Sequence, residues 1–527
     1  MSSDATPHRD EPARARLHNL QQTDDAPGVM PVEPETPPMR GRKGLTPDGR
    51  LRSGRLAGLT MNRAIWVLSW PVMLESFLNS LVGLTDTALA ARLPDGESAT
   101  DAIAGASYIM WFIGLIFMAL GIGATALVAR SVGKGRMAVA NAVLGQTVTL
   151  GAVIGVATAA FIALASRPVA GWLNMSDAAT EAFNQYMLVI ALGVPSATML
   201  FSLIACARGA GDSIRPLYAM AVRNVVNIGT SWALSGAEVM GVSGPVDLGV
   251  TGIAIGTVAG DIAGAAVVIT MATRGTWGIR LRWKRMTPHW HTMRRIVRLG
   301  VPNFLETLGM WMGNFVVILM VGWLGLREGA SGLLGTHMVA IRIESLSFLP
   351  GFAMGAAAAT LSGQYLGAGS TEHAARAIRR CAVVAAGVMY AFGLVFLYAP
   401  EHATRLLSDQ PVHLDYVPVL LMVCGFIQIP FGLAIVTRGA MRGAGDVKVV
   451  MAITWFCTYL VRLPLAYVIS GVDIPLPEVM GGGVLTNPSP LDGGLVGLWV
   501  GLCLEHVIRC LLFVARLAQG GWARARV

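Results

Sequence analysis

Twelve long apolar runs constrain this chain more than any other feature of its sequence. About 20 apolar residues in a helix cross the hydrocarbon core of a bilayer, and a helix satisfies its own backbone polar groups in lipid. The sequence therefore predicts an all-α membrane protein with twelve transmembrane helices. The runs cover approximately residues 64–90, 102–129, 138–164, 181–206, 217–235, 250–273, 296–325, 335–366, 381–400, 416–437, 449–470 and 494–515.

The composition agrees with a membrane protein except at the N-terminus. Of the 527 residues, 54% are hydrophobic and only 13% are charged, about half the charged share of a typical soluble domain. Residues 1–60 are instead rich in proline and charge, which is typical of a disordered tail. This segment has no apolar core of a secretory signal, so we expect no cleavage.

Lysine and arginine alternate between the two sides of the predicted bundle. The connection at 274–295 is rich in basic residues, whereas the opposite side carries only Arg92, Arg167, Arg327 and Arg405. Cytoplasmic loops carry the excess of basic residues, so we expect an inner (plasma) membrane protein with both termini cytoplasmic. The net charge of +9 then reflects topology, and we expect no nucleic-acid partner.

The chain repeats itself after six spans. The sequence RGAGD occurs at 208–212 and again 234 residues later at 442–446, and GKG at 133–135 has the counterpart GAG at 367–369. An even number of spans leaves the second copy facing the same way as the first. The repeat therefore predicts two six-helix lobes related by an axis along the membrane normal, an arrangement suited to alternating access.

This repeat sets the expected domain boundaries. They are a disordered cytoplasmic tail at 1–60, a first lobe at 61–273, a basic cytoplasmic linker at 274–295, a second lobe at 296–518 and a short cytoplasmic tail at 519–527.

Four features of the sequence carry a family resemblance. They are Pro71 followed about four turns later by Asp86, ALGIGATALVARSVGKG at 119–135, RIESLSFLPGFAMGAAAATLSGQYLGAG at 342–369, and the paired RGAGD. With these features the chain resembles the multidrug and toxic compound extrusion (MATE) family, particularly its DinF-like branch. The resemblance covers about residues 60–518. It implies twelve helices in two lobes and export driven by an inward Na⁺ or H⁺ gradient.

The first lobe holds a candidate cation site. Asp86 lies in an apolar run, where an ionised carboxylate is costly unless it pairs, binds a cation or takes up a proton. Asn227 and Ser231 share one helix face, and Thr257 is expected at a similar depth. Carboxylate, amide and hydroxyl oxygens suit Na⁺, and Asp86 could instead carry H⁺.

The family resemblance implies the same set with one departure. Asp86, Asn227 and Thr257 match residues that bind the coupling ion in related members. Ser231 stands where some members carry a second Asp, and Asp261, one turn after Thr257, could replace that carboxylate. The choice between Na⁺ and H⁺ stays open.

The second lobe also carries charged residues inside its spans. Glu306, Arg342 and Glu344 are candidates for a second coupling site, although structural ion pairing is the default expectation for such groups. Glu306 matches a coupling Glu of other family branches imperfectly, because that Glu usually lies about one turn further from the proline. Pro71 and Pro195 are expected to kink their helices.

The sequence argues against several other functions. It contains no HExxH, GxSxG or GxxxxGK[ST] motif, and its six cysteines form no CxxC pair, so we expect neither an enzyme nor an ATP-driven pump. We expect no cofactor, and no metal beyond a coupling Na⁺. The predicted function is a monomeric antiporter that extrudes amphipathic, often cationic organic compounds. The alternative is a lipid-linked oligosaccharide or polysaccharide flippase of the same superfamily.

Overall fold

The computed structural model describes residues 44–525, apart from 95, 173–174, 240, 329–331 and 476–482. The described chain is almost entirely helical. Its first half contains α2 (Met61–Ala90), α3 (Gly96–Gly133), α4 (Met137–Trp172), α5 (Asp177–Ala210), α6 (Ile214–Ser235), strands β1 (Glu238–Val239) and β2 (Val242–Ser243), and α7 (Gly249–Arg274).

The second half has the same order of elements with small additions. It contains η2 (Trp283–Arg285), α8 (Trp290–Glu328), α9 (Leu333–Gly367), α10 (Thr371–Tyr398), α11 (Pro400–Arg405), α12 (Pro411–Ala444), α13 (Val447–Trp455), the π-helical η3 (Phe456–Arg462), α14 (Leu463–Ser470), strands β3 (Ile474–Pro475) and β4 (Val484–Leu485), α15 (Gly494–Ala518) and η5 (Gly521–Arg524).

Each of the twelve predicted spans corresponds to a helical segment. Within the described residues, eleven of these segments are long and apolar enough to cross a membrane, with 447–470 counted as one. The remaining segment is α6, whose 22 residues include Arg215, Arg223, Asn224 and Asn227. These polar side chains lower its hydropathy, and three of them are buried inside the protein, so lipid does not have to solvate them.

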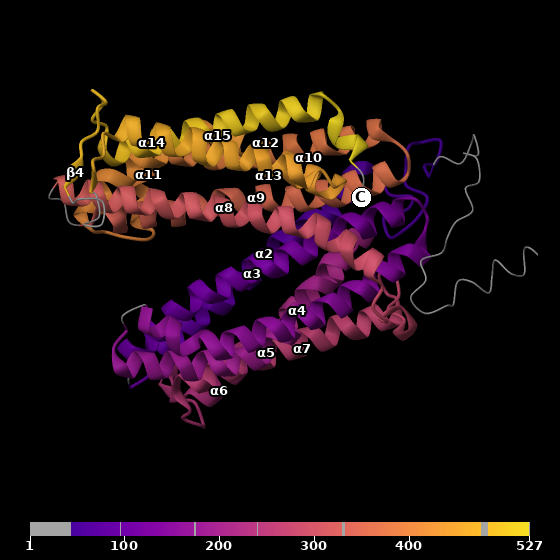
Figure 1. The fold of residues 1–527 in the computed structure, drawn as a ribbon, viewed down its shortest axis with the longest axis horizontal. Helices are drawn as coiled ribbons and strands as arrows, with labels where there is room; N and C mark the ends of the chain where they lie inside the picture. Colours follow the sequence, from indigo (N-terminus) through magenta and orange to yellow (C-terminus); the bar gives the residue numbers. More distant parts are fainter. Residues whose placement is uncertain are drawn as a thin grey trace, which may run out of the picture.

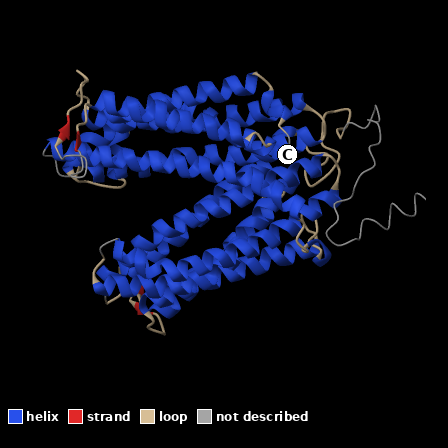
Figure 2. Ribbon diagram, in the orientation of Figure 1, coloured by secondary structure: helices blue, strands red, loops and turns tan. Residues whose placement is uncertain are grey.

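The helices form two groups that follow the internal repeat. Figure 1 shows α2–α7 in one group and α8–α15 in the other, and Figure 2 shows how little of the molecule is not helix. The two groups diverge toward the end that carries the β1–β2 and β3–β4 hairpins, which we call the hairpin end. They converge at the opposite end, which carries the linker and the two RGAGD motifs and which we call the basic end.

The two RGAGD motifs fold alike. Gly211 and Gly445 directly follow α5 and α12, with φ of 93° and 91°. Only glycine adopts such a left-handed conformation without strain. A residue in this conformation ends a helix, because the N–H groups that follow can then bond to the last carbonyls of the helix. The N–H of Asp212 bonds to the Ala207 carbonyl and that of Asp446 to the Met441 carbonyl, both at 2.9 Å.

Glycines bring the two lobes into backbone contact at the basic end. A Cβ added to Gly133 of α3 would overlap the carbonyl oxygen of Gln364 in α9. The Gln364 side chain donates through Nε2 to the Gly209 carbonyl at 2.9 Å, and Thr360 donates to the Arg208 carbonyl at 3.1 Å. Small residues permit this close approach of helices, so the basic end is closed by direct packing.

The segment 44–60 differs from the expected unstructured tail. Leu45, Leu51 and Leu56 are buried against the second lobe. The segment bonds to both lobes, because the Gly44 N–H donates to the Ala368 carbonyl at 3.2 Å and the Ser53 hydroxyl to the Val132 carbonyl at 2.6 Å. The four leucines of this segment, Leu59 included, were too few among its polar residues to signal a packed segment in sequence. Residues 1–43 of the expected tail lie outside the described residues.

The linker and the C-terminal segment also pack against the bundle. Trp277, Ile279 and Leu281 are buried in the core of the first lobe, and Gln146 of α4 bonds to the Arg285 carbonyl at 2.7 Å. Trp522 of η5 is buried as well. Pro71 and Pro195 lie inside the continuous helices α2 and α5, where the expected kink stays a prediction.

Candidate functional site

The four residues of the expected cation site converge from three helices of the first lobe. Asp86 lies one turn before the end of α2, Asn227 and Ser231 lie on α6, and Thr257 lies on α7. All four are buried, with exposed fractions of 5% or less. Gly256 permits this geometry, because a Cβ there would overlap the Ser231 side chain.

Thr257 is the centre of the hydrogen-bond network. Its hydroxyl donates to Oδ2 of Asp86 at 2.9 Å and accepts from Nδ2 of Asn227 at 3.0 Å. The same Nδ2 lies 3.5 Å from the Ser231 hydroxyl, which donates to the Ile253 carbonyl at 3.3 Å. The structure therefore joins Asp86, Asn227, Ser231 and Thr257 in one buried cluster.

Two oxygens of this cluster lack a hydrogen-bond donor. Oδ1 of Asp86 and Oδ1 of Asn227 are buried, and neither has a partner among the described residues. An unsatisfied buried acceptor is costly, and an unsatisfied carboxylate more so. A hard cation or a proton on Asp86 would relieve this cost, so the donor set fits either ion.

Tyr186 is a member of the cluster that the sequence did not reveal. Its hydroxyl, on α5, lies 3.4 Å from Oδ2 of Asp86 and donates to it. A lone tyrosine in an apolar helix is normally a packing residue, so only its contact with α2 in the folded protein identifies it. The cluster therefore touches four of the six helices in this lobe.

Asp261 lies outside this network. Its Oδ1 accepts from Nε of Arg223 at 2.5 Å, and both side chains are buried. Arg223 also donates to Oδ1 of Asn79 at 3.4 Å and lies over the Phe201 ring, 5.8 Å from its centroid. The arginine, which the sequence analysis did not single out, thus neutralises the second carboxylate of the lobe.

Glu306 of the second lobe forms a buried ion-pair cluster. Its Oε2 lies 2.7 Å from NH2 of Arg442, and its Oε1 lies 3.4 Å from Nε of Arg438 and accepts from Thr454 at 3.0 Å. The first lobe has the equivalent pair, because Arg208 of the first RGAGD lies 2.5 Å from Glu75. A pair present in both copies is the structural role expected by default for such charges.

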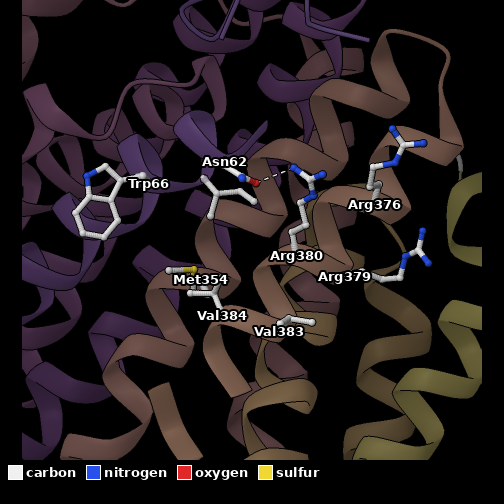
Figure 3. Close-up of a pocket in the computed structure, with 9 residues that line it drawn as sticks. Asn62, Trp66, Met354, Arg376, Arg379, Arg380, Val383 and Val384 are labelled. Carbon is white, nitrogen blue, oxygen red and sulfur yellow. Dashed lines mark hydrogen bonds between the residues drawn. The ribbon is translucent and has the colours of Figure 1, made fainter. Parts of the chain in front are cut away.

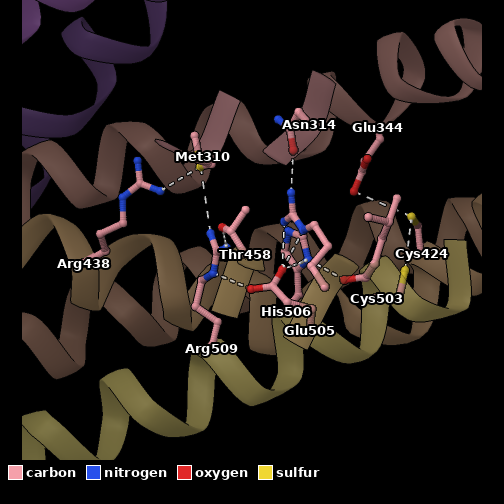
Figure 4. Close-up of polar contacts among 12 residues, drawn as sticks. Met310, Asn314, Glu344, Cys424, Arg438, Thr458, Cys503, Glu505, His506 and Arg509 are labelled. Atoms are coloured by element: carbon pink, nitrogen blue, oxygen red, sulfur yellow. Dashed lines mark hydrogen bonds and ion pairs between the residues drawn. The ribbon is translucent and has the colours of Figure 1, made fainter. Parts of the chain in front are cut away.

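Glu505 organises a second charged cluster (Figure 4). It accepts from Arg462 at 2.8 Å and from Arg509 at 2.6 Å, and Arg509 also bonds to Thr458 at 3.1 Å. Arg462 and Thr458 belong to the π-helical η3, which ends two residues before Pro464. Proline lacks an N–H and disrupts regular α-helical bonding, and the local change in register accompanies this cluster.

Glu344 and Arg342 do not pair with each other. Glu344 accepts from the Cys424 thiol at 3.6 Å, and Cys424 lies 3.8 Å from the Cys503 sulfur (Figure 4). Arg342 is exposed. In the described part of the chain, no three His, Cys, Asp or Glu side chains gather as a metal site would require.

Comparison with known proteins identifies the family. The MatE family profile matches residues 71–233 and 302–468, one match in each lobe. The chain belongs to the MatE family. Its members are membrane transporters, so this protein is a transporter and not an enzyme. The two matches begin at Pro71 and Pro302, the equivalent positions of the internal repeat.

MatE relatives cover nearly the whole chain. A "Probable multidrug resistance protein NorM" of Thermotoga maritima is 25% identical over 460 residues, which are 87% of this chain and 93% of that protein. A "Multidrug resistance protein MdtK" of Pectobacterium atrosepticum is 22% identical over 87% of this chain and 95% of its own.

Solved MatE structures share the fold. A "MATE in the bent conformation" superposes with a TM-score of 0.77 at 18% identity, over 88% of this chain and 96% of that one. A transporter of the wider superfamily from Pyrococcus furiosus, whose description reports "Reverse polarity of binding pocket", superposes at 0.75 with 18% identity, over 88% and 97%. The assignment of this chain to the DinF-like branch stays an expectation.

Proposed function

We propose that this protein exports amphipathic, often cationic organic compounds in exchange for Na⁺ or H⁺ moving inward. The basic end would face the cytoplasm, because it carries the arginine-rich connections that are retained there. The lobes, which diverge at the hairpin end (Figure 1), would then be in an outward-open state. Alternating access would follow from rocking of the two lobes about the central substrate.

The observation that carries this proposal is the pair of unpartnered oxygens at Asp86 and Asn227. They belong to helices α2 and α6, and Thr257 of α7 connects them. An ion that binds there adds an interaction between these helices. A ligand shifts a conformational equilibrium only when it binds one state better than the other, and a site shared by several helices supplies such a difference.

The ion pair of Asp261 bears on how many coupling ions bind in each transport cycle. With Arg223 on Asp261, Asp86 is the carboxylate of the expected site that has no ion pair among the described residues. We therefore infer that one monovalent cation, or one proton, enters the first lobe in each transport cycle.

Aromatic side chains between the lobes favour amphipathic substrates. Trp111 of α3 and Trp311 of α8 meet with ring centroids 4.0 Å apart, and Phe112 and Phe304 lie 6.0 Å apart on the same two helices. Aromatic faces bind organic cations. The names of the relatives, which refer to multidrug resistance, agree with this substrate class.

The experiment uses purified protein in liposomes with ethidium as the transported dye. A Na⁺ gradient and a pH gradient are imposed separately on the wild type and on Asp86→Asn, with the exposed Asp409→Asn as the matched control. We expect one gradient to drive transport in the wild type and the control, and Asp86→Asn to reduce it by about tenfold or more.

Coupled transport that survives in folded Asp86→Asn would refute this site. Transport that responds to neither gradient in the wild type would refute antiport itself.

One observation favours the flippase alternative. The interior of the second lobe contains four buried or nearly buried arginines but only two glutamates that pair with them. The arginines are Arg438, Arg442, Arg462 and Arg509, and the glutamates are Glu306 and Glu505. An excess of positive charge suits a phosphate-bearing substrate. Transfer of a fluorescent lipid-linked oligosaccharide across the liposome membrane, without either gradient, would support this alternative.

A further inference from the structure

A groove between the two lobes opens at the basic end, on the outer surface of the bundle. Its volume is about 590 Å³. One wall comes from the start of α2 in the first lobe, with Asn62, Ile65 and Trp66, and the rest comes from α9 and α10 in the second lobe (Figure 3). Arg380 crosses the groove and donates to Oδ1 of Asn62 at 2.7 Å.

Three arginines give the groove a net positive charge. Arg376, Arg379 and Arg380 lie on one face of α10, three and four residues apart, and all three line the groove. Glu372 pairs with Arg376 at 2.5 Å, whereas the Asn62 amide that meets Arg380 carries no charge. The Arg379 side chain has no hydrogen bond or ion pair within the described part of the chain. Two positive charges are therefore uncompensated.

The apolar part of the groove lies deeper along the same helices. Val383 and Val384 follow the arginines by one turn of α10, and they are 69% and 42% exposed. Trp66 follows Asn62 by one turn of α2 and is 65% exposed, on the opposite side of the groove (Figure 3). Both helices thus change from polar to apolar in the same direction, from the basic end toward the middle of the membrane.

We propose that this groove binds one anionic phospholipid of the cytoplasmic leaflet. The arginines would hold the headgroup phosphate, with Arg379 free to make a charge-assisted bond. The acyl chains would lie along Val383, Val384 and Trp66. The position of the groove in the cytoplasmic leaflet rests on the orientation given under the proposed function. A free phosphate would use the arginines alone, so the exposed apolar wall favours the lipid.

The lipid would also stabilise one conformation. Ile65, which lines the groove, and Leu68 of α2 belong to one buried apolar cluster with Leu361, Ile378 and Cys381 of the second lobe. The groove consequently exists only while the basic ends of the lobes are together. A ligand that contacts both walls favours this closed state over the state in which the lobes separate there.

Native mass spectrometry of the purified, delipidated full chain tests the proposal. The probes are phosphatidylglycerol and phosphatidylcholine. The test variants are Arg379→Gln, Arg379→Gln/Arg380→Gln and Trp66→Ala, and the matched control is Arg405→Gln at the hairpin end. We expect the wild type to retain one phosphatidylglycerol in preference to phosphatidylcholine, and its affinity to fall about fivefold for each arginine removed.

Each remaining outcome has a defined meaning. Lower affinity of Trp66→Ala for phosphatidylglycerol supports a lipid site. Equal binding of both lipids, or unchanged binding by the double variant, contradicts it. Displacement of the lipid by millimolar inorganic phosphate would assign the site to free phosphate and overturn the proposal. Binding is measured without a gradient or a transported dye, so it can fail while antiport succeeds, and the reverse.

A distance measurement tests the conformational effect. Spin labels on Arg136→Cys of the first lobe and Lys448→Cys of the second report the separation of the basic ends. All six native cysteines are buried, so the label reacts preferentially with the two introduced cysteines. In nanodiscs, phosphatidylglycerol should increase the short-distance population of the wild-type chain relative to phosphatidylcholine. The same response in Arg379→Gln/Arg380→Gln would show that the groove does not mediate it.

Discussion

At the scale of single residues, the buried carboxylates of this protein differ in whether an arginine compensates their charge. Glu75 and Glu306 each face an arginine of an RGAGD motif, and Glu505 faces two arginines. Asp86 accepts from the Thr257 and Tyr186 hydroxyls, and no ion pair involves it among the described residues. Because a buried ion pair is internally neutral whereas a lone buried carboxylate is costly, Asp86 is the group expected to exchange an ion during transport.

The Arg223–Asp261 pair carries a prediction about stoichiometry. In Arg223→Met, Asp261 loses the cation that compensates it. We expect this variant to bind one additional Na⁺ or H⁺ per cycle and to lose about 3 kcal/mol of stability, as is typical when a buried pair is broken. The ratio of ions to substrate, measured from the reversal potential in liposomes, checks the first expectation, and thermal unfolding checks the second.

The double variant Arg223→Met/Asp261→Asn is the control for that experiment. It removes both charges, so the wild-type ratio and part of the stability should return. An unchanged ratio in a folded Arg223→Met protein would mean that Asp261 has no influence on ion binding.

At the scale of elements, glycine decides where helices of different lobes meet. α3 and α9 touch at Gly133 and Gln364, and a Cβ added to Gly367 would likewise overlap the Arg130 carbonyl oxygen. The same residues belong to the GKG and GAG repeats, so each lobe offers a small-residue surface at the corresponding helix end. The contact holds the basic end closed without a single ion pair between these two helices among the described residues.

Enlarging Gly133 should open this contact. In Gly133→Leu, the side chain would overlap the Gln364 backbone, so the two helices must separate. We expect the labels on Arg136→Cys and Lys448→Cys to move apart and gradient-driven transport to decrease. Gly114→Leu is the matched control, since a Cβ at Gly114 on the same helix meets nothing within 4 Å. If both variants behave like the wild type, the glycine contact does not maintain closure.

At the scale of the whole molecule, segment 44–60 connects the two lobes at the closed end. Leu51 and Leu56 are only 2% and 1% exposed, and Arg55 of the same segment lies 3.5 Å from Asp212 of the first RGAGD. The segment therefore packs on the second lobe while an ion pair ties it to the first, and it should favour the state in which the basic ends are together.

Shortening one buried side chain of this segment should lower the stability of the protein. Leu56→Ala removes buried apolar contacts and leaves a cavity, which should lower stability by about 3 kcal/mol. It should also broaden the distance distribution between labels on Arg136→Cys and Lys448→Cys. Arg52→Ala, an exposed change in the same segment, is the control. Equal unfolding temperatures for the two variants would contradict a structural role of the segment.

The class of fold follows from the residues along the chain, because lipid requires each span separately to be apolar and long enough to cross it. The length of each apolar run and the six-span repeat were sufficient to predict a helical bundle in two copies. The repeat also placed the two RGAGD motifs at equivalent points of the chain. In the structure Gly211 and Gly445 of these motifs follow equivalent helices, since backbone conformation there depends on local residue type.

The compensation of each buried polar group depends on contacts that form when the chain folds. Asp86 and Asp261 are similar in sequence terms, since each is a carboxylate in an apolar run. They differ because Arg223 reaches one of them, whereas Tyr186 and Thr257 reach the other. Such contacts join residues up to 171 positions apart, and the electrostatic energy of a buried charge depends on those neighbours rather than on its own segment.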